Sequence, residues 1–127
     1  MTTVQVDLTR LKSPFFPRLE EIDRLYTWHE WKGYRCADAY TNAELEYFAI
    51  RNSTGVFDLS PMTKYRITGA ESRVYIDRLV TRDMISKVGP GRVAYSVWCN
   101  DQGQVIDDGT IFHLSEGEYR LCSQERH

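Results

Sequence analysis

The stretch that decides the fold is residues 92–114, RVAYSVWCNDQGQVIDDGTIFHL. Apolar, β-branched and aromatic residues on both sides of residues 100–103 predict two strands joined by a tight turn. The second strand carries two adjacent carboxylates, Asp107 and Asp108, although aspartate is disfavoured within strands. This pair marks the hairpin as the place to look for function.

Neighbouring side chains of a strand point to opposite faces, so Asp107 and Asp108 do not share one site as a coupled acid pair. Alternation groups Asp108 with Ile106, Thr110, Phe112 and Leu114, and Asp107 with Val105, Gly109, Ile111 and His113. We expect Asp108 on the more apolar face. A carboxylate there needs hydrogen-bond partners or a ligand, because a bare buried charge is too costly. Both readings stay open: a strand aspartate satisfied by the backbone or an arginine, and a carboxylate held in a ligand pocket.

The composition predicts one ordinary globular domain. Of the 127 residues, 42% are hydrophobic and 27% charged, and no apolar run approaches the length of a membrane helix. The first ten residues lack the apolar centre of a secretion signal. We therefore expect a cytoplasmic protein with no membrane partner.

Charge and cysteine usage argue against two further classes of function. The formal net charge is −2 and the basic residues are scattered, which gives no footprint for nucleic acid. Cys36, Cys99 and Cys122 are odd in number and widely spaced, so neither a disulfide framework nor a zinc site is predicted. His29 and His113 have no partner at ligand spacing, and we expect no metal site.

The rest of the chain predicts an α+β protein, an antiparallel sheet with a few helices. Pro14 and Pro17 predict an irregular segment over residues 1–18, and residues 19–40 give no clear pattern. We expect a helix capped by Thr41 or Asn42 and stopped by Gly55, followed by a strand over residues 64–68. A second helix is expected over residues 70–80, with Tyr75, Ile76, Leu79 and Val80 buried. A turn at residues 89–91 and a strand over residues 119–122 complete the prediction. The sequence ends directly after a strand, so we also expect a piece of a longer polypeptide.

Several segments follow one another in a recognisable order. They are Tyr40, RNSTGVFDLSPM at residues 51–62, YRITG at 65–69, LVTRD at 79–83, YSV at 95–97 and NDQGQVIDD at 100–108. Together they resemble the folate-dependent aminomethyltransferase family, the T protein of the glycine cleavage system and its relatives. The order of the motifs, over about residues 40–124, makes the resemblance specific.

The resemblance implies the N-terminal part of the aminomethyltransferase folate-binding fold. Family members are much longer, with three domains around a channel that holds tetrahydrofolate. We expect a lead-in segment over residues 1–40 and a truncated part of the folate-binding domain over residues 41–127.

The resemblance also implies the residues of a site. Asp108 matches the carboxylate that contacts tetrahydrofolate where the one-carbon unit is exchanged, so it is predicted to bind the cofactor and to steer or shuttle a proton. Tyr95 matches a tyrosine lining the folate pocket, and Val97 lies beside it on the same strand face. Gln124 stands where relatives often place a folate-contacting asparagine.

Four departures from the family pattern point to a relative with its own donor. Pro61 and Gln104 replace a common histidine and the second glycine of the hairpin turn, and Gln124 is one methylene longer than the common asparagine. The tryptophan- and tyrosine-rich residues 26–40 differ from the Gly-Trp-x-x-Pro run of glycine-cleavage T proteins. Some branches take methyl groups from methoxylated aromatics or a sulfonium compound. The implied donor is therefore a small molecule or a carrier protein bearing an aminomethyl or methyl group.

Two alternatives stand beside a tetrahydrofolate-dependent one-carbon transferase. One is a non-catalytic folate-binding or assembly factor on the same fold, but such relatives usually lack the aspartate pair, so Asp107 and Asp108 favour the enzyme. The other is a structural piece with no site of its own, in which Tyr95 is a core residue and Trp28 and Trp31 only pack.

Overall fold

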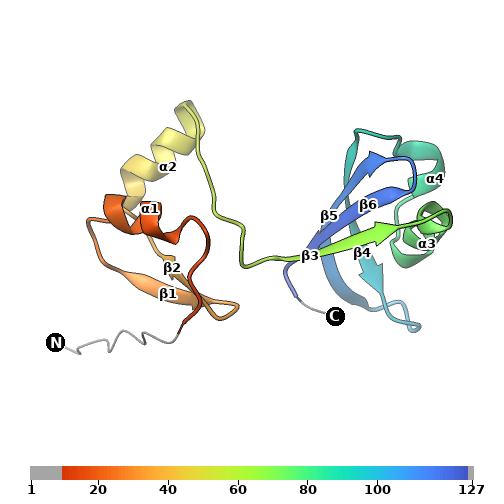
Figure 1. Cartoon of the computed structure of the whole chain (residues 1–127), viewed down its shortest axis with the longest axis horizontal. Helices are drawn as coiled ribbons and strands as arrows, with labels where there is room; N and C mark the ends of the chain where they lie inside the picture. Colours follow the sequence, from red (N-terminus) through yellow and green to blue (C-terminus); the bar gives the residue numbers. More distant parts are fainter. Residues whose placement is uncertain (1–9, 126–127) are drawn as a thin grey trace. The chain divides into compact units, whose positions relative to one another are not determined.

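The computed structural model describes residues 10–125, and the chain forms two compact units, Met1–Pro61 and Met62–His127 (Figure 1). We call them unit 1 and unit 2 and describe each by itself. The division expected after residue 40 stays a prediction. No helix within residues 10–125 is long and apolar enough to cross a membrane.

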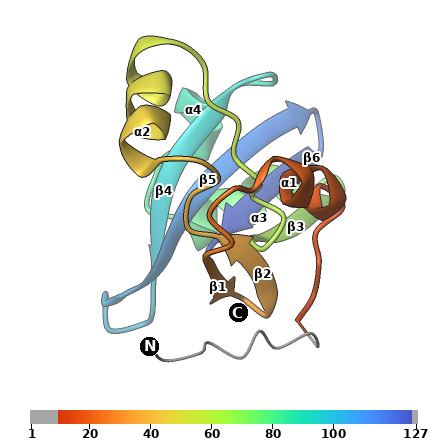
Figure 2. The same ribbon diagram turned by 90° about the vertical axis from the view of Figure 1, so that its left-hand side faces the viewer.

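Unit 2 contains a four-stranded antiparallel sheet. Its strands are β3 (Thr63–Thr68), β4 (Val93–Cys99), β5 (Val105–Ser115) and β6 (Glu118–Ser123), in the spatial order β3-β6-β5-β4. Figure 2 shows β4 and β5 running side by side to their connecting turn. The predicted hairpin and the predicted α+β class with an antiparallel sheet are thus confirmed.

Helices α3 (Ser72–Leu79) and α4 (Met84–Lys87) cover one face of this sheet. The core between them consists of Ile76, Val80, Met84, Val88, Ala94, Trp98, Ile111, Tyr119 and Leu121. The predicted burial of Ile76 and Val80 is confirmed. Tyr75 is 56% exposed and its predicted burial is wrong, because it lies about 100° around the helix from the buried Ile76.

The covered face of β5 is the face of Asp107, not that of Asp108. Gly109, Ile111 and His113 are buried, whereas Asp108 is exposed. Asp108 shares its face with Ile106, Thr110, Phe112 and Leu114 as predicted, but the implied burial of Asp108 is wrong within residues 10–125. Both faces of β5 carry apolar residues, and the packing of α3 and α4 against the opposite face decides which of them is enclosed.

Unit 1 contains α1 (Phe16–Ile22), a hairpin of β1 (Trp28–Trp31) and β2 (Tyr34–Ala37), and α2 (Ala43–Asn52). The irregular segment predicted over residues 1–18 is wrong from Phe16 onward, and residues 1–9 lie outside the described residues. Pro17 stands at the start of α1, where its missing N–H has no helical partner to lose. The hairpin turns at Lys32 and Gly33, both with positive φ (55° and 79°), as a tight two-residue turn requires.

Helix α2 begins as predicted and ends earlier than predicted. The Asn42 side chain accepts a hydrogen bond from the backbone N–H of Leu45 at 3.0 Å, which confirms Asn42 as the cap. The helix ends at Asn52 rather than continuing to Gly55. None of its residues is buried, and Leu45 is 67% exposed.

Candidate functional site

Three of the predicted site residues lie on the open face of the β4–β5 hairpin. Asp108 and Val97 are directly opposite each other in the register, and Tyr95 pairs with Thr110, the next residue of β5 on the Asp108 face. The Tyr95 hydroxyl donates a hydrogen bond to Asp108 Oδ2. Tyr95 is 61% exposed, so a ring and a carboxylate stand together on an accessible sheet surface.

The hydrogen bond to Asp108 affects the pKa of Tyr95. Donation to the Asp108 carboxylate, with a smaller contribution from desolvation, raises the pKa of Tyr95 above its ordinary value. Tyr95 therefore remains a phenol and a donor at neutral pH. Asp108 Oδ1 accepts no hydrogen bond from any residue in the range 10–125. One carboxylate oxygen is thus fixed by Tyr95 and the other is available as an acceptor.

A β-bulge lies next to the aspartate pair. Trp98 pairs with Asp107 and Cys99 with Val105, so Ile106 has no partner in the β4–β5 register. Bulges commonly accompany active sites, because they redirect the neighbouring side chains. The bulge shifts the β4–β5 register one residue before Asp107.

The turn accommodates the glutamine that departs from the family pattern. Asn100 Oδ1 accepts hydrogen bonds from the backbone N–H groups of Gln104 (2.9 Å) and Gln102 (3.1 Å). The Asn100 side-chain amide donates to Gln104 Oε1 at 2.9 Å, and Gly103 supplies the positive φ of 76°. A second glycine at position 104 is not needed for this turn.

Gln124 lies at the same corner of the sheet. The last pair of the β5–β6 ladder is Gly109 with Ser123, so Asp108 and Gln124 are the next residues on either strand. Beyond them, the backbone N–H of Glu125 donates to Asp107 Oδ2 at 3.1 Å. The structure therefore brings Tyr95, Val97, Asp108 and Gln124 to one region, and their roles stay predictions.

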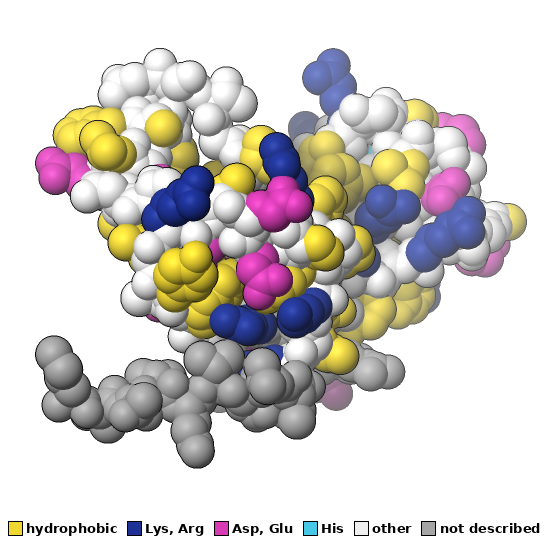
Figure 3. All heavy atoms as spheres, turned by 60° about the vertical axis from the view of Figure 1, so that its left-hand side comes forward, with side chains coloured by type: hydrophobic (Ala, Val, Ile, Leu, Met, Phe, Trp, Pro, Cys, Tyr) yellow, Lys and Arg dark blue, Asp and Glu magenta, His cyan; other side chains and the backbone are white. Residues whose placement is uncertain are grey.

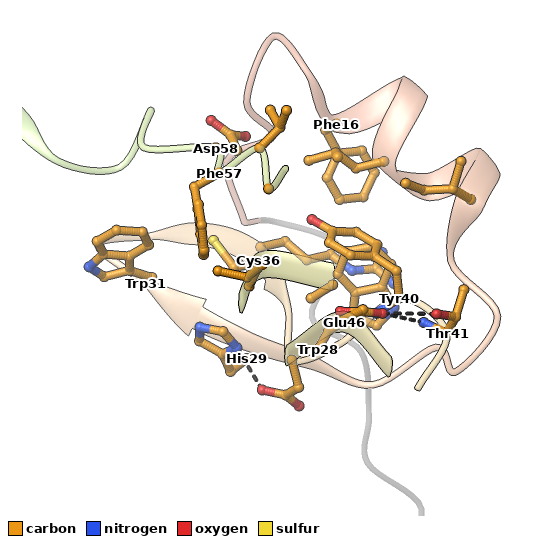
Figure 4. Close-up of a pocket in the computed structure, with 18 of the residues that line it drawn as sticks. Phe16, Trp28, His29, Trp31, Cys36, Tyr40, Thr41, Glu46, Phe57 and Asp58 are labelled. Atoms are coloured by element: carbon orange, nitrogen blue, oxygen red, sulfur yellow. Dashed lines mark hydrogen bonds and ion pairs between the residues drawn. The ribbon is translucent and has the colours of Figure 1, made fainter. Parts of the chain in front are cut away.

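Unit 1 contains a cavity that sequence reasoning missed. It has a volume of about 530 Å³, and side chains from α1, the β1–β2 hairpin, α2 and residues 54–58 face it (Figure 4). Its aromatic lining residues are Phe16, Trp28, Trp31, Tyr40 and Phe57. The crowding of tryptophan and tyrosine over residues 28–40 was the available signal. On the face of unit 1 that Figure 3 presents, apolar side chains lie among charges of both signs.

The polar groups of this cavity largely serve unit 1 itself. Glu46 accepts hydrogen bonds from the backbone N–H groups of Tyr40 (2.9 Å) and Thr41 (2.7 Å). Burial raises the pKa of Tyr40, and the nearby Asp58 carboxylate raises it further. The Arg35 guanidinium lies 4.3 Å from the centre of the Trp28 ring, where a bound cation would otherwise stack. Trp28 Nε1 and Arg35 Nε are buried without a hydrogen-bond partner within residues 10–125, so these contacts satisfy the polar groups of the lining only in part.

Comparisons with known proteins place this chain beside one family. The family model of the GCVT N-terminal domain matches residues 22–127. The aminomethyltransferase of Desulforamulus reducens is 37% identical over 92 residues, which cover 72% of this chain and 25% of that protein. The aminomethyltransferase of Halalkalibacterium halodurans is 32% identical over 110 residues, covering 87% of this chain and 29% of that protein.

A solved structure shares the fold. It is the crystal structure of the glycine cleavage system aminomethyltransferase T from Bartonella henselae, with a TM-score of 0.74 and 19% identity. The match covers 89% of this chain and 31% of that chain. The present chain thus spans about a quarter to a third of the length of the relatives it matches.

Proposed function

Because this chain belongs to the GCVT N-terminal domain family, we propose that it supplies the folate-binding part of a tetrahydrofolate-dependent one-carbon transfer. The resemblance seen in its motifs is a true family relationship. The observation that carries the proposal is the Tyr95–Asp108 hydrogen bond on the open hairpin face, which leaves Asp108 Oδ1 available.

The carboxylate acceptor of Asp108 and the apolar surface beside it suit a flat heterocycle with N–H groups. Asp108 Oδ1 accepts a hydrogen bond from the ring, Val97 offers an apolar contact, and the Tyr95 ring borders the same surface. Tetrahydrofolate, when bound, supplies the nitrogens that take up the one-carbon unit. Asp108 then holds the pterin and steers a proton at the reacting nitrogen, an effect worth roughly 10²–10⁴ in rate for a well-placed group.

The donor is an aminomethyl or methyl group on a small molecule or on a carrier protein. The departures at Pro61 and over residues 26–40 support a donor that differs from that of the glycine-cleavage T proteins. Gln104, in contrast, fits the turn through its side-chain hydrogen bond with Asn100, so this departure does not indicate a different donor.

The test is tetrahydrofolate binding by the wild-type chain, Asp108→Asn and Asp101→Asn, measured by calorimetry. Asp101 lies exposed in the turn of the same hairpin, so its variant removes the same charge away from the site. We expect Asp108→Asn to weaken binding at least tenfold, since it replaces an ionic acceptor, and Asp101→Asn to bind like wild type. Equal affinities for all three proteins would refute the proposal.

A transfer assay separates the enzyme from the non-catalytic folate-binding alternative. The polypeptide purified from its source cells is incubated with tetrahydrofolate and methylated or aminomethylated donors, and the one-carbon derivative of tetrahydrofolate is quantified. We expect Asp108→Asn to lower the transfer rate by about 10²-fold or more. Tight folate binding without any transfer would establish the binding factor instead.

A further inference from the structure

Within residues 10–125, two hydrogen bonds of Asp107 join separate parts of unit 2. Its Oδ1 accepts the backbone N–H of Asp108 at 2.8 Å, and its Oδ2 accepts the backbone N–H of Glu125 at 3.1 Å. The two bonds use different oxygens of one carboxylate. Asp107 therefore links β5, at the residue that faces the open site, to the segment that follows β6.

These bonds lie where the ladder bonds stop. The bulge at Ile106 interrupts the β4–β5 pairing before Asp107, and the β5–β6 ladder ends at Gly109 with Ser123. Backbone groups at such an end need partners from elsewhere. The Asp107 carboxylate is a charged acceptor for two of them, and hydrogen bonds to ionised acceptors are stronger than those between neutral groups.

A second bond fixes the same segment from the other side. Ser123, which is fully buried, donates through its hydroxyl to the carbonyl oxygen of Glu125 at 2.5 Å. The N–H and the C=O of Glu125 are thus both held, one by Asp107 and one by Ser123. Gln124 lies between these anchored positions.

We propose that Asp107 is a positioning residue that fixes Asp108 and Gln124 relative to each other at the folate site. This inference rests on the proposed function. It explains why two carboxylates stand side by side although they face opposite sides of the sheet: one faces the ligand, and the other holds the backbone that presents it. Small displacements of a contact group are costly in a site that depends on placement.

The chemistry of the side chain makes the role testable. Asparagine retains one acceptor oxygen, but its amide nitrogen cannot accept an N–H. Asp107→Asn therefore keeps at most one of the two bonds and should free either Asp108 or Glu125. Loss of one charge-assisted bond in the site predicts roughly a tenfold weaker affinity for tetrahydrofolate.

The experiment is a double-mutant cycle with tetrahydrofolate as the titrant. Asp107→Asn is measured in the wild-type and in the Gln124→Ala background, with Asp101→Asn as the charge-matched control in both. If Asp107 acts in part through Gln124, its effect on Kd shrinks from about tenfold to about threefold or less once Gln124 is truncated. Hydrogen exchange at the Asp108 or the Glu125 amide should accelerate in Asp107→Asn and stay unchanged in Asp101→Asn.

Each result has one meaning. An unchanged Kd in Asp107→Asn, or the same fold loss in both backgrounds, overturns the positioning role while wild-type folate binding still supports the proposed function. A wild-type chain that does not bind tetrahydrofolate overturns the proposed function and this inference with it. If Asp107→Asn fails to fold, Ser123→Ala serves instead, because it removes the hydrogen bond to the carbonyl oxygen of Glu125. We expect Ser123→Ala to weaken the affinity for tetrahydrofolate about threefold, and an unchanged affinity would contradict the inference.

Discussion

The two units of this chain are stabilised by different means. All nine residues of the hydrophobic core cluster belong to unit 2, where helices α3 and α4 cover one sheet face. Within residues 10–61, the buried apolar side chains are Phe16, Ala39 and Pro61, and α2 buries none of its own. Unit 1 relies instead on side-chain bonds to the backbone, such as those of Glu46, and on Arg35 stacked against Trp28.

The difference in burial between the two units bears on the candidate site. Apolar burial makes a rigid sheet, and a rigid sheet keeps Tyr95 and Asp108 in register. The same contrast predicts which substitutions matter, because lost core volume costs far more than lost exposed volume.

The largest effect should follow from truncating the core of unit 2. Ile111 is fully buried, so Ile111→Ala should lower the free energy of unfolding by about 2–5 kcal/mol. Leu45→Ala, at a 67% exposed position of α2, should change it by less than about 0.5 kcal/mol. Urea unfolding followed by circular dichroism measures both. Similar costs for the two variants would remove the distinction between the units.

The next effect concerns the close approach of β5 to β6. A Cβ added at Gly109 would lie 2.2 Å from the backbone oxygen of Cys122, so the strands must move apart. Gly109→Ala should destabilise unit 2 by about 1–3 kcal/mol. Gly89→Ala is the control, since nothing lies within 4 Å of its added Cβ. Thermal melting of the two variants decides the point, and equal melting temperatures would contradict the packing described at Gly109.

A smaller effect should follow from uncapping α2. Asn42→Ala leaves the N–H of Leu45 without its acceptor and should cost about 1 kcal/mol, because helix caps contribute at this level. Asn42→Ser keeps an oxygen at the cap and should recover most of the loss. Far-ultraviolet circular dichroism and amide exchange at Leu45 report the change. A cap variant with unaltered exchange would mean that unit 1 does not depend on this bond.

The smallest effect should be a pH dependence of unit 1. Burial acts to raise the pKa of Glu46, but hydrogen bonds from Thr41 and Tyr40 outweigh it and lower the pKa below its ordinary value of 4.5. The stabilisation is therefore complete above pH 4.5 and is lost as the pH falls through the lower, folded-state pKa. Glu46→Gln should flatten this acid dependence, measured by amide exchange at Thr41 between pH 5 and 3. An unchanged acid profile in that variant would assign the dependence to another group.

Local sequence patterns predicted the helices and strands better than they predicted which face of a strand is buried. The hairpin, the Asn42 cap and the strand before Gly69 follow from alternation, capping chemistry and turn residues, which neighbouring residues decide. Which face of β5 is enclosed was missed, because both faces carry apolar residues and distant helices cover only one of them. Helix α1 was missed because Pro17 was taken to disrupt regular structure, whereas it starts a helix.

The site could be predicted only in part, for similar physical reasons. Tyr95, Val97 and Asp108 share a face by register, which alternation and a two-strand hairpin make visible in the sequence. The second bond of Asp107 reaches across 18 residues of sequence to Glu125, and no local pattern contains it. The cavity of unit 1 depends on residues 54–58 returning to the hairpin, which is also a non-local event.

The adjacency of Asp107 and Asp108 restricts how this hairpin can change in length. Because faces alternate along a strand, inserting or deleting one residue between Asp108 and the buried Ile111 would turn Asp108 inward and Asp107 outward. Changes of length should therefore be confined to residues 100–104, where the chain reverses and no buried face must be kept. Homologous hairpins should vary in length at the turn and keep a constant spacing from the aspartate pair to the core.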